Sequence, residues 1–356
     1  MLQALLRLLR GKKEIRKVAM NPIRGFWQKL IDEKRLQGET LTVVAPMADV
    51  TDIAFRTMIA KYSKPNGPDV MWTEFVSADG LCSGGREILK RDLEFTDIER
   101  PIVAQLFTST PDNMRKAAAL CRELGFDGID INMGCPDKSI EKQGAGAAHI
   151  KDWKTAQKVI RAAQEGAEHL PVSVKTRIGY NKIEFMEWLP KLLECNIPVL
   201  TVHLRTRKEM SKVDAHWDLM PEVVALVRQM TGELKDGGTL ILGNGDVKSV
   251  KEGREKAAVT GADGVMIGRG MFGTPWFFDE DAYEKGKTTE ERLKILIEHT
   301  KLYEKKLGDI KSFAIMKKHY KAYVNGFDAA KELRMELMEC ENSAEIEAKV
   351  SNFLKQ

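Results

Sequence analysis

The chain has 356 residues, 43% of them hydrophobic and 30% charged, so it can bury one large hydrophobic core and a smaller one. Its net charge of +4 does not indicate a nucleic-acid partner, and any basic surface must therefore be local. No apolar run approaches the roughly 20 residues that span a membrane. The five cysteines are scattered and form no CxxC pair, which argues against a disulfide framework or a zinc site. We therefore expect a cytoplasmic protein with no membrane span and no metal.

Residues 1–38 are a basic leader, with ten Lys and Arg against three Asp and Glu. Its leucines at positions 2, 5, 6 and 9 would share one helical face, but charges interrupt the apolar run and no signal-peptide cleavage pattern is present. We expect an N-terminal helical extension, docked or frayed; binding to a membrane surface or to RNA is the alternative.

Strands and helices alternate between residues 39 and 287. Eight strands separated by helices are typical of a (β/α)8 TIM barrel, an α/β fold, rather than of an open doubly wound sheet. The predicted strands are Leu41–Ala45, Val70–Glu74, Ile102–Phe107, Gly128–Asn132, Val172–Thr176, Val199–His203, Thr239–Leu242 and Gly264–Ile267. The predicted helices between them include Asp112–Leu124, Trp153–Glu165, Glu184–Cys195, Pro221–Met230 and Lys248–Thr260.

Residues 288–356 are predicted to form a small C-terminal helical domain. Its expected helices are Thr289–Leu307, Ser312–Asn325 and Ala329–Cys340, with one more near the C-terminus. Seven lysines and two acidic residues lie between Lys301 and Lys321, with aromatic residues among them. This segment is either a solvated helix face or a surface that contacts phosphates.

Polar side chains should gather at the carboxyl ends of four consecutive strands, where parallel barrels carry their chemistry. Alternation along the strands puts the following residues on the interior face: Gln105, Asp130, Asn132, Ser173, Lys175, Arg177, His203 and Arg205. Burying an unpaired ammonium costs several kcal/mol. Lys175 is therefore predicted to be functional, with a structural ion pair to Asp130 as the alternative.

Glycines follow the seventh and eighth strands, in the runs Gly243–Asp246 and Gly268–Gly270. Glycine lets a ligand approach the backbone N–H groups, and the loops after these two strands are where barrels commonly hold a phosphate. The two runs together predict a phosphorylated cofactor or substrate; tight turns are the alternative.

Cys135 lies between Gly134 and Pro136, on a turn that the proline stiffens. An unperturbed thiol has a pKa of about 8.5 and is mostly protonated at neutral pH, so it could deliver a proton. Acting as a nucleophile would require an activator, for which His203 is one candidate; that histidine could equally donate to an electron-rich ring. An inert cysteine remains the alternative.

Eight motifs follow one another in a specific order. They are APMADVTDIAFR (45–56), TEFVSADGL (73–81), AQLF (104–107), DINMGCP (130–136), VKTRIG (174–179), VHLRTR (202–207), GNGDV (243–247) and GVMIGRGMFGTPW (264–276). In order and spacing they resemble the tRNA-dihydrouridine synthases, flavin enzymes that reduce specific uridines in tRNA. The tail segment MKKHYKAYVNGFDAAKELR (316–334) is similar to the helical RNA-binding domain of that family.

The resemblance implies FMN across the barrel mouth. Pro46 and Met47 would line the isoalloxazine, Gln105 and Lys175 would meet its pyrimidine edge, and His203 would lie beside the ring. The residues implied near the phosphate are Asn244, Gly245, Asp246, Gly268 and Arg269.

The resemblance also implies the reaction and the partner. NADPH would reduce the flavin, FMN N5 would pass hydride to C6 of a flipped uracil, and Cys135 would protonate C5. The residues implied in tRNA binding are Asn132, Arg177 and Arg205 near the base, and Lys317, Lys318 and Lys321 in the tail. The protein is expected to be a monomer.

Two other functions stay open from the residues alone. A related FMN barrel could act on a small molecule, as dihydroorotate dehydrogenases do, although the lysine-rich tail and the GCP turn argue against it. An RNA-binding module without redox activity is the second, and the presence of both Lys175 and Cys135 argues against that.

Overall fold

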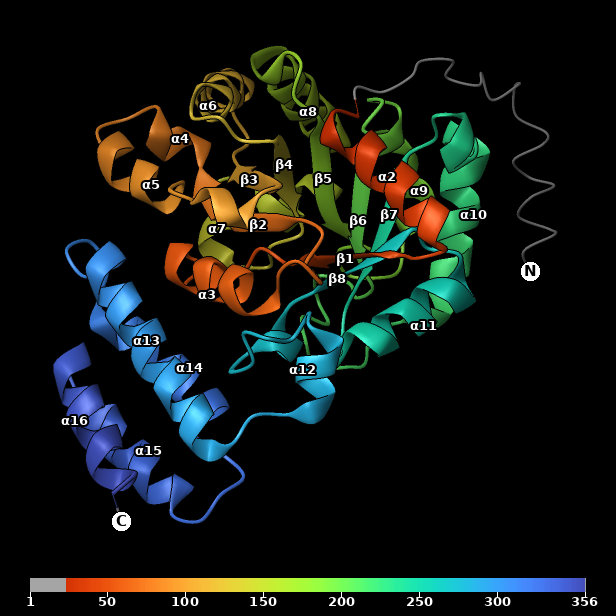
Figure 1. Cartoon of the computed structure of the whole chain (residues 1–356). Helices are drawn as coiled ribbons and strands as arrows, with labels where there is room; N and C mark the ends of the chain where they lie inside the picture. Colours follow the sequence, from red (N-terminus) through yellow and green to blue (C-terminus); the bar gives the residue numbers. More distant parts are fainter. Residues whose placement is uncertain (1–23, 356) are drawn as a thin grey trace.

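A computed structural model describes residues 24–355, and within them eight parallel strands form a barrel (Figure 1). Their hydrogen-bonded order is β1-β8-β7-β6-β5-β4-β3-β2. The ring closes where Val43 bridges Val70 in parallel, with Val44 N donating to Val70 O at 3.1 Å. The strands are β1 (Leu41–Val44), β2 (Met71–Ser77), β3 (Ile102–Phe107), β4 (Gly128–Met133), β5 (Val172–Arg177), β6 (Val199–His203), β7 (Leu240–Asn244) and β8 (Gly264–Ile267).

The predicted (β/α)8 barrel is confirmed, and the bounds of β3, β6 and β8 are the predicted ones. The largest differences lie at the carboxyl ends of β2 and β7. Ser77 still pairs in register with β3, and Asn244 pairs in register with both His203 and Met266. Asn244 therefore belongs to a strand, although the glycines around it predicted a turn.

Helices on the outside of the barrel separate the strands, as in other barrels of this type. Several begin at a side-chain cap: Asp152 accepts from Thr155 N, and Ser249 accepts from Glu252 N. The helices of the barrel region are α3 (Ile53–Ser63), α4 (Ala78–Leu81), α5 (Arg86–Asp92), α6 (Pro111–Glu123), α7 (Lys138–Lys142), α8 (Trp153–Ala167), α9 (Phe185–Leu193), α10 (Met220–Thr231), α11 (Val250–Thr260) and α12 (Glu280–Lys285). The short 3-10 helices are η1 (Asp97–Glu99), η2 (Gly146–Ile150), η3 (Trp217–Leu219), η4 (Leu234–Asp236) and η5 (Arg269–Met271).

Helix α2 (Phe26–Gln37) covers the amino ends of the strands. Its Trp27 and Ile31 are buried in one cluster with the first residues of β1, β6 and β7. The ring centroids of Trp27 and Trp72 are 5.9 Å apart. This part of the basic leader is thus a hydrophobic plug, at the end of the barrel opposite the carboxyl ends. The predicted leucine face at positions 2 to 9 lies outside the described residues.

The C-terminal helices form a second hydrophobic cluster at one side of the barrel, beside α3 (Figure 1). They are α13 (Thr289–Leu307), the 3-10 helix η6 (Phe313–Met316), α14 (Lys317–Tyr323), α15 (Ala330–Glu339) and α16 (Ser343–Phe353). The single helix predicted for 312–325 is therefore divided into η6 and α14. Among the described residues, no helix is both long and apolar enough to cross a membrane.

Polar contacts also join the helical tail to the barrel. The ammonium of Lys311 lies 2.7 Å from a Glu74 carboxylate oxygen and 2.8 Å from one of Asp92. These two carboxylates, with burial opposing them, raise the pKa of Lys311 above its ordinary value. On α13, Glu298 accepts a hydrogen bond of 2.7 Å from the Tyr62 hydroxyl of α3. The tail is thus anchored to the barrel by ion pairs as well as by apolar packing.

Two buried histidines lie where the tail meets the barrel. The rings of His299 and His319 are 5.0 Å apart, and both are about 6 Å from Phe55 of α3. Burial lowers the pKa of His319 to about 3 and that of His299 well below its ordinary value. Both rings are therefore neutral in the folded protein.

Acid should weaken this contact. An unfolded histidine takes up a proton near pH 6.5, whereas the folded rings resist protonation, so stability falls as the pH drops below that value. Between pH 7.5 and 5.5, each histidine should cost about 1 kcal/mol of unfolding free energy. Urea unfolding at both pH values measures this loss. The His319→Phe protein should lose less stability than the wild type over this interval, and equal losses would contradict the assignment.

Candidate active site

A cavity of about 1300 Å³ opens at the carboxyl ends of the strands. It brings together fourteen residues that the sequence predicts at the site. They are Pro46, Met47, Gln105, Asn132, Cys135, Lys175, Arg177, His203, Arg205, Asn244, Gly245, Asp246, Gly268 and Arg269. The other three, Lys317, Lys318 and Lys321, lie on α14 and do not line the cavity.

A hydrogen-bonded polar row runs through the barrel interior, and two of its residues, Gln105 and Asn132, line the cavity. Gln105 Nε2 donates to Asp130 at 2.6 Å, and Ser173 Oγ donates to the other oxygen of the same carboxylate at 2.5 Å. Asn132 Nδ2 donates in turn to Gln105 Oε1 at 3.2 Å. Burial raises the pKa of Asp130 to about 6, against the hydrogen bonds from Gln105 and Ser173. The carboxyl group is thus held in the barrel by neutral partners.

Lys175 is the cation that faces the cavity from β5. Its Nζ donates to Asn244 Oδ1 at 3.0 Å, and Asn244 Nδ2 donates to Met266 O at 2.8 Å, so the amide oxygen is turned toward the lysine. In the described part of the chain no carboxylate lies within 4.0 Å of this ammonium, so Asp130, the alternative partner, acts on Lys175 through its charge and not through a direct ion pair. Burial, and then the charge of Arg177, lower the pKa of Lys175 to about 8. A bound anionic group would offset the free-energy cost of burying this charged ammonium.

Hydrogen bonds to its backbone groups fix the turn that carries Cys135. Asn132 Oδ1 accepts from Cys135 N at 2.9 Å and from Gly134 N at 3.1 Å, while Cys135 O accepts from Ala147 N at 2.9 Å. Gly146 has φ of +60°, and a Cβ there would lie 2.8 Å from Cys135 O, so only glycine fits. Burial raises the pKa of the Cys135 thiol. The thiol is therefore protonated at neutral pH, and the backbone that carries it is held in one place.

Two buried arginines bind backbone carbonyls around this turn. Arg177 donates from Nε to Gly134 O at 2.6 Å, and from Nη1 to Thr206 O at 3.2 Å and Met210 O at 3.3 Å. Burial lowers its pKa to about 10. Arg205 donates from Nε to Val213 O at 2.6 Å. Both were predicted near the base, but these N–H groups are occupied by the protein itself.

His203 is a neutral ring in the cavity wall. Its Nε2 lies 3.2 Å from Arg205 Nη1, and because a guanidinium can only donate, Nε2 accepts and Nδ1 carries the proton. Burial, and then the charges of Arg177 and Lys175, hold the pKa of His203 well below its ordinary value. Of its two predicted roles, this tautomer favours donation to an electron-rich ring over activation of the cysteine.

The loops after β7 and β8 form a positively charged corner. Asp246 forms ion pairs with both Arg205 and Arg269, the second at 3.1 Å, so one carboxylate faces two guanidinium groups. Gly268 lies against Met47, where a Cβ would come within 3.2 Å of the sulfur atom. The corner can therefore accept a phosphate close to its backbone. The Asp246 carboxylate is better suited to hold the arginines than to touch an anion.

One wall of the cavity was missed by sequence reasoning. Trp217 donates from Nε1 to Gly245 O at 2.7 Å, and the Lys256 ammonium lies 5.3 Å from the centre of its ring. Both residues line the cavity. A single tryptophan after an irregular loop has no periodic pattern, so no sequence signal could have placed it there.

The protonation state of Cys135 can be measured directly. Because the thiolate is the form that iodoacetamide attacks, the alkylation rate of Cys135 should rise about tenfold per pH unit and level off only above pH 9.0. Mass spectrometry of the Cys135 peptide across pH 6 to 10 gives the profile, with glutathione as the reference thiol. The midpoint, unlike the rate, does not depend on access to the cavity. A midpoint below that of glutathione would contradict a raised pKa.

Comparison with known proteins identifies the family. The model of the dihydrouridine synthase family matches residues 43–356. The chain is 38% identical over 332 residues to the "Probable tRNA-dihydrouridine synthase 2" of Bacillus subtilis (strain 168), covering 92% of this chain and 96% of that protein. It is 39% identical over 335 residues to the "Probable tRNA-dihydrouridine synthase" of Staphylococcus aureus (strain COL), covering 93% and 96%. The chain belongs to the dihydrouridine synthase family.

Proposed function

We propose that this protein reduces the C5–C6 double bond of specific uridines in tRNA, with FMN as its bound cofactor and NADPH as the reductant. Membership of the dihydrouridine synthase family makes it a flavin-dependent oxidoreductase. The observation that carries the finer proposal is that one cavity holds both a protonated thiol on a hydrogen-bonded turn and a buried cation with no carboxylate at ion-pair distance among the described residues.

The cavity suits FMN in charge and in shape. The Lys175 ammonium is available to the pyrimidine edge, with Gln105 beside it. Arg269 and the glycines at 245 and 268 would hold the phosphate in the positive corner. Pro46 and Met47 would line the ring, with His203 donating to it from Nδ1. When bound and reduced by NADPH, the flavin supplies the hydride that goes to C6 of the uracil.

Cys135 completes the reaction by giving its Sγ proton to C5. An acid needs to be protonated and positioned. Burial keeps the thiol protonated, and the bonds that Cys135 N donates to Asn132 Oδ1 and Cys135 O accepts from Ala147 N hold the backbone that carries it. Asn132 would contact the base only with the remaining N–H of its amide, because its Oδ1 already accepts two backbone bonds. Arg177 and Arg205 would contribute mainly through the backbone that they hold.

The substrate nucleotide must leave its stack to reach the thiol in this cavity. We infer that the helical tail (288–356) binds the rest of the tRNA. Of the three lysines predicted there, Lys318 and Lys321 are exposed, whereas Lys317 donates to Met338 O at 2.5 Å. Lys318 also lies 3.8 Å from an Asp49 carboxylate oxygen, so Lys321 is the best placed of the three for a phosphate contact. The enzyme would act as a monomer in the cytoplasm.

Replacing Cys135 distinguishes the reduction of the flavin by NADPH from the reduction of the uridine. We expect Cys135→Ala to form dihydrouridine in an unmodified tRNA transcript at least about 100-fold more slowly, because general acid catalysis typically contributes that much. Flavin content and the rate of flavin reduction by NADPH should stay as in the wild type. Nuclease digestion and mass spectrometry count the product. Product formation at the wild-type rate would reject the role of the thiol, and absence of product with the wild type would reject the proposed function.

The Lys175 ammonium should favour the reduced, anionic cofactor. In Lys175→Met, we expect weaker FMN retention and a flavin midpoint potential lower by on the order of 30 mV, which for two electrons is about 1.4 kcal/mol. Visible absorbance of the purified protein gives the FMN content, and a redox titration gives the potential. A variant with the wild-type content and potential would remove Lys175 from the cofactor site.

A further inference from the structure

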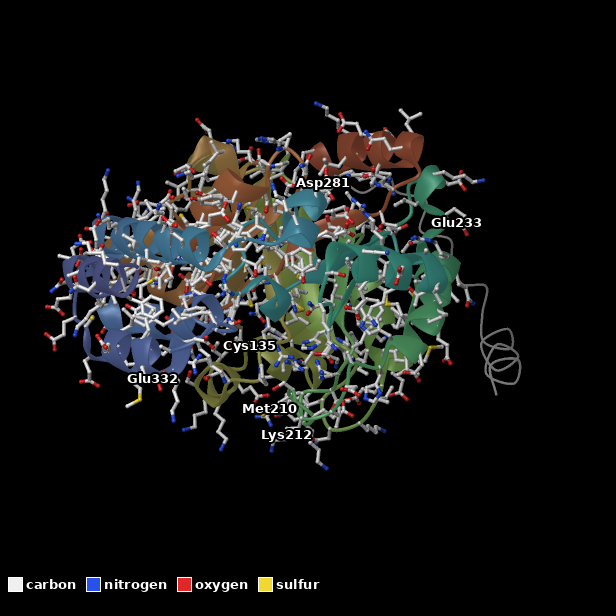
Figure 2. The ribbon with its side chains drawn as sticks, turned by 60° about the horizontal axis from the view of Figure 1, so that its bottom comes forward. Cys135, Met210, Lys212, Glu233, Asp281 and Glu332 are labelled. Carbon is white, nitrogen blue, oxygen red and sulfur yellow. The ribbon has the colours of Figure 1, made fainter. Side chains whose placement is uncertain are left out.

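The loop that follows β6 presents apolar side chains to solvent at the edge of the cavity. We call residues 206–215 the β6 loop. Met210 is 43% exposed and Val213 is 41% exposed, and both line the cavity. Figure 2 shows Met210 and Lys212 on the same side of the molecule as Cys135, away from Glu233 and Asp281. Neither the cofactor site nor the acid uses these two apolar side chains.

Hydrogen bonds hold the backbone that carries these exposed side chains. Besides the bonds from Arg177 and Arg205, Thr206 N donates to Glu209 Oε2 at 2.7 Å and Lys212 N donates to Glu209 O at 2.9 Å. Met210 itself has φ of +53°, a left-handed conformation that is uncommon for a residue with a side chain. The loop therefore holds these two apolar side chains at the edge of the cavity, where they stay partly exposed.

The β6 loop and the Cys135 turn are tied together as one unit. A single guanidinium, that of Arg177, donates both to Gly134 O, next to the acid, and to Met210 O in the loop. A second connection runs through Arg207, which forms an ion pair with Glu141 of α7 and lies 3.5 Å from Pro136 O. Whatever contacts Met210 is thus positioned relative to the thiol.

The charge of the loop indicates which partner it fits. Lys208 and Lys212 are exposed on either side of Met210, and within the described residues no carboxylate lies at ion-pair distance from either ammonium. The loop also carries Glu209, which lies 3.1 Å from His216 Nε2, and the exposed Asp214, so three cations face two carboxylates and its net charge is +1. Apolar side chains between unpaired cations suit a nucleic-acid strand, because its bases offer apolar faces and its phosphates offer negative charge.

We propose that the β6 loop is a contact surface for the RNA strand that flanks the target nucleotide. Met210 and Val213 cover the base face that is uncovered when the target leaves the stack, and Lys208 and Lys212 contact the neighbouring phosphates. The inference rests on the proposed function and adds to it the residues that hold the flipped-out state. Because the loop is bonded to the Cys135 turn, this contact also sets the distance between the base and the acid.

The apolar contact is tested by the double variant Met210→Ser/Val213→Ser. Its matched control is Leu36→Ser/Val259→Ser, which removes two exposed apolar side chains from α2 and α11, outside the cavity. With unmodified tRNA transcript, the loop variant should have kcat/KM lower by roughly tenfold, mainly through KM, while the control stays at the wild-type value. Flavin reduction by NADPH should be equal in all three proteins. Wild-type kcat/KM in the loop variant would overturn the proposal.

The ionic contact has a separate readout. For Lys208→Ala/Lys212→Ala, the slope of log Kd for tRNA against log salt concentration should fall by about one to two units, whereas the apolar variant keeps the wild-type slope. The control Lys158→Ala/Lys235→Ala removes the same charge from exposed lysines on α8 and η4 that do not line the cavity. Equal slopes in the two lysine variants would overturn the phosphate contacts.

The measurements on the wild type and on the loop variants distinguish a failure of the proposed function from a failure of the loop contact. If the wild type forms no dihydrouridine in any tRNA, the proposed function fails and the loop contact fails with it. If the wild type forms product and the loop variants match their controls, the proposed function stands and only the loop contact is wrong. Product formation with a selective loss in the loop variants supports both.

Discussion

Parallel pairing between neighbouring strands sets the height of each side chain in the cavity, and the rest of the site depends on it. Two rows of Cα partners cross the barrel wall: Gln105, Asp130 and Ser173 in one, and Arg177, His203 and Asn244 in the other. Residues two apart along a strand face the same side, so both rows add polar groups to one interior. A shift of β5 by one residue against β4 would turn Lys175 and Arg177 outward and replace them with apolar side chains.

The interior so formed is positive, although the protein as a whole is nearly balanced in charge. Lys175 has an amide as its partner, and one carboxylate, that of Asp246, serves both Arg205 and Arg269. Burying this excess of positive charge away from water costs free energy, as the lowered pKa values of Lys175 and Arg177 indicate. Such a cost is typical of functional sites, where a charged ligand compensates for it. Net charge counted over the whole sequence could not reveal this local concentration.

The sequence predicted what depends on local periodicity and missed what depends on the path of the chain in space. Alternation along β4 and β5 placed Asp130, Asn132 and Lys175 in the interior, because each strand has only two faces. The partners of Arg177 are carbonyls of the β6 loop, whose course no periodic pattern describes. The basic composition of the leader likewise gave no sign that Trp27 is buried at the amino end of the barrel.

Burial shifts the pKa values of the acid and of the cation in opposite directions, yet both groups stay protonated at neutral pH. It favours the neutral form of each group, so it raises the pKa of the Cys135 thiol and lowers that of Lys175 to about 8. At pH 7 the lysine is still charged in about nine molecules of ten, and the thiol keeps its proton. An anion bound beside them would raise both pKa values, because negative charge stabilises the ammonium and opposes the thiolate. A negatively charged cofactor therefore strengthens the protonation states that the reaction needs.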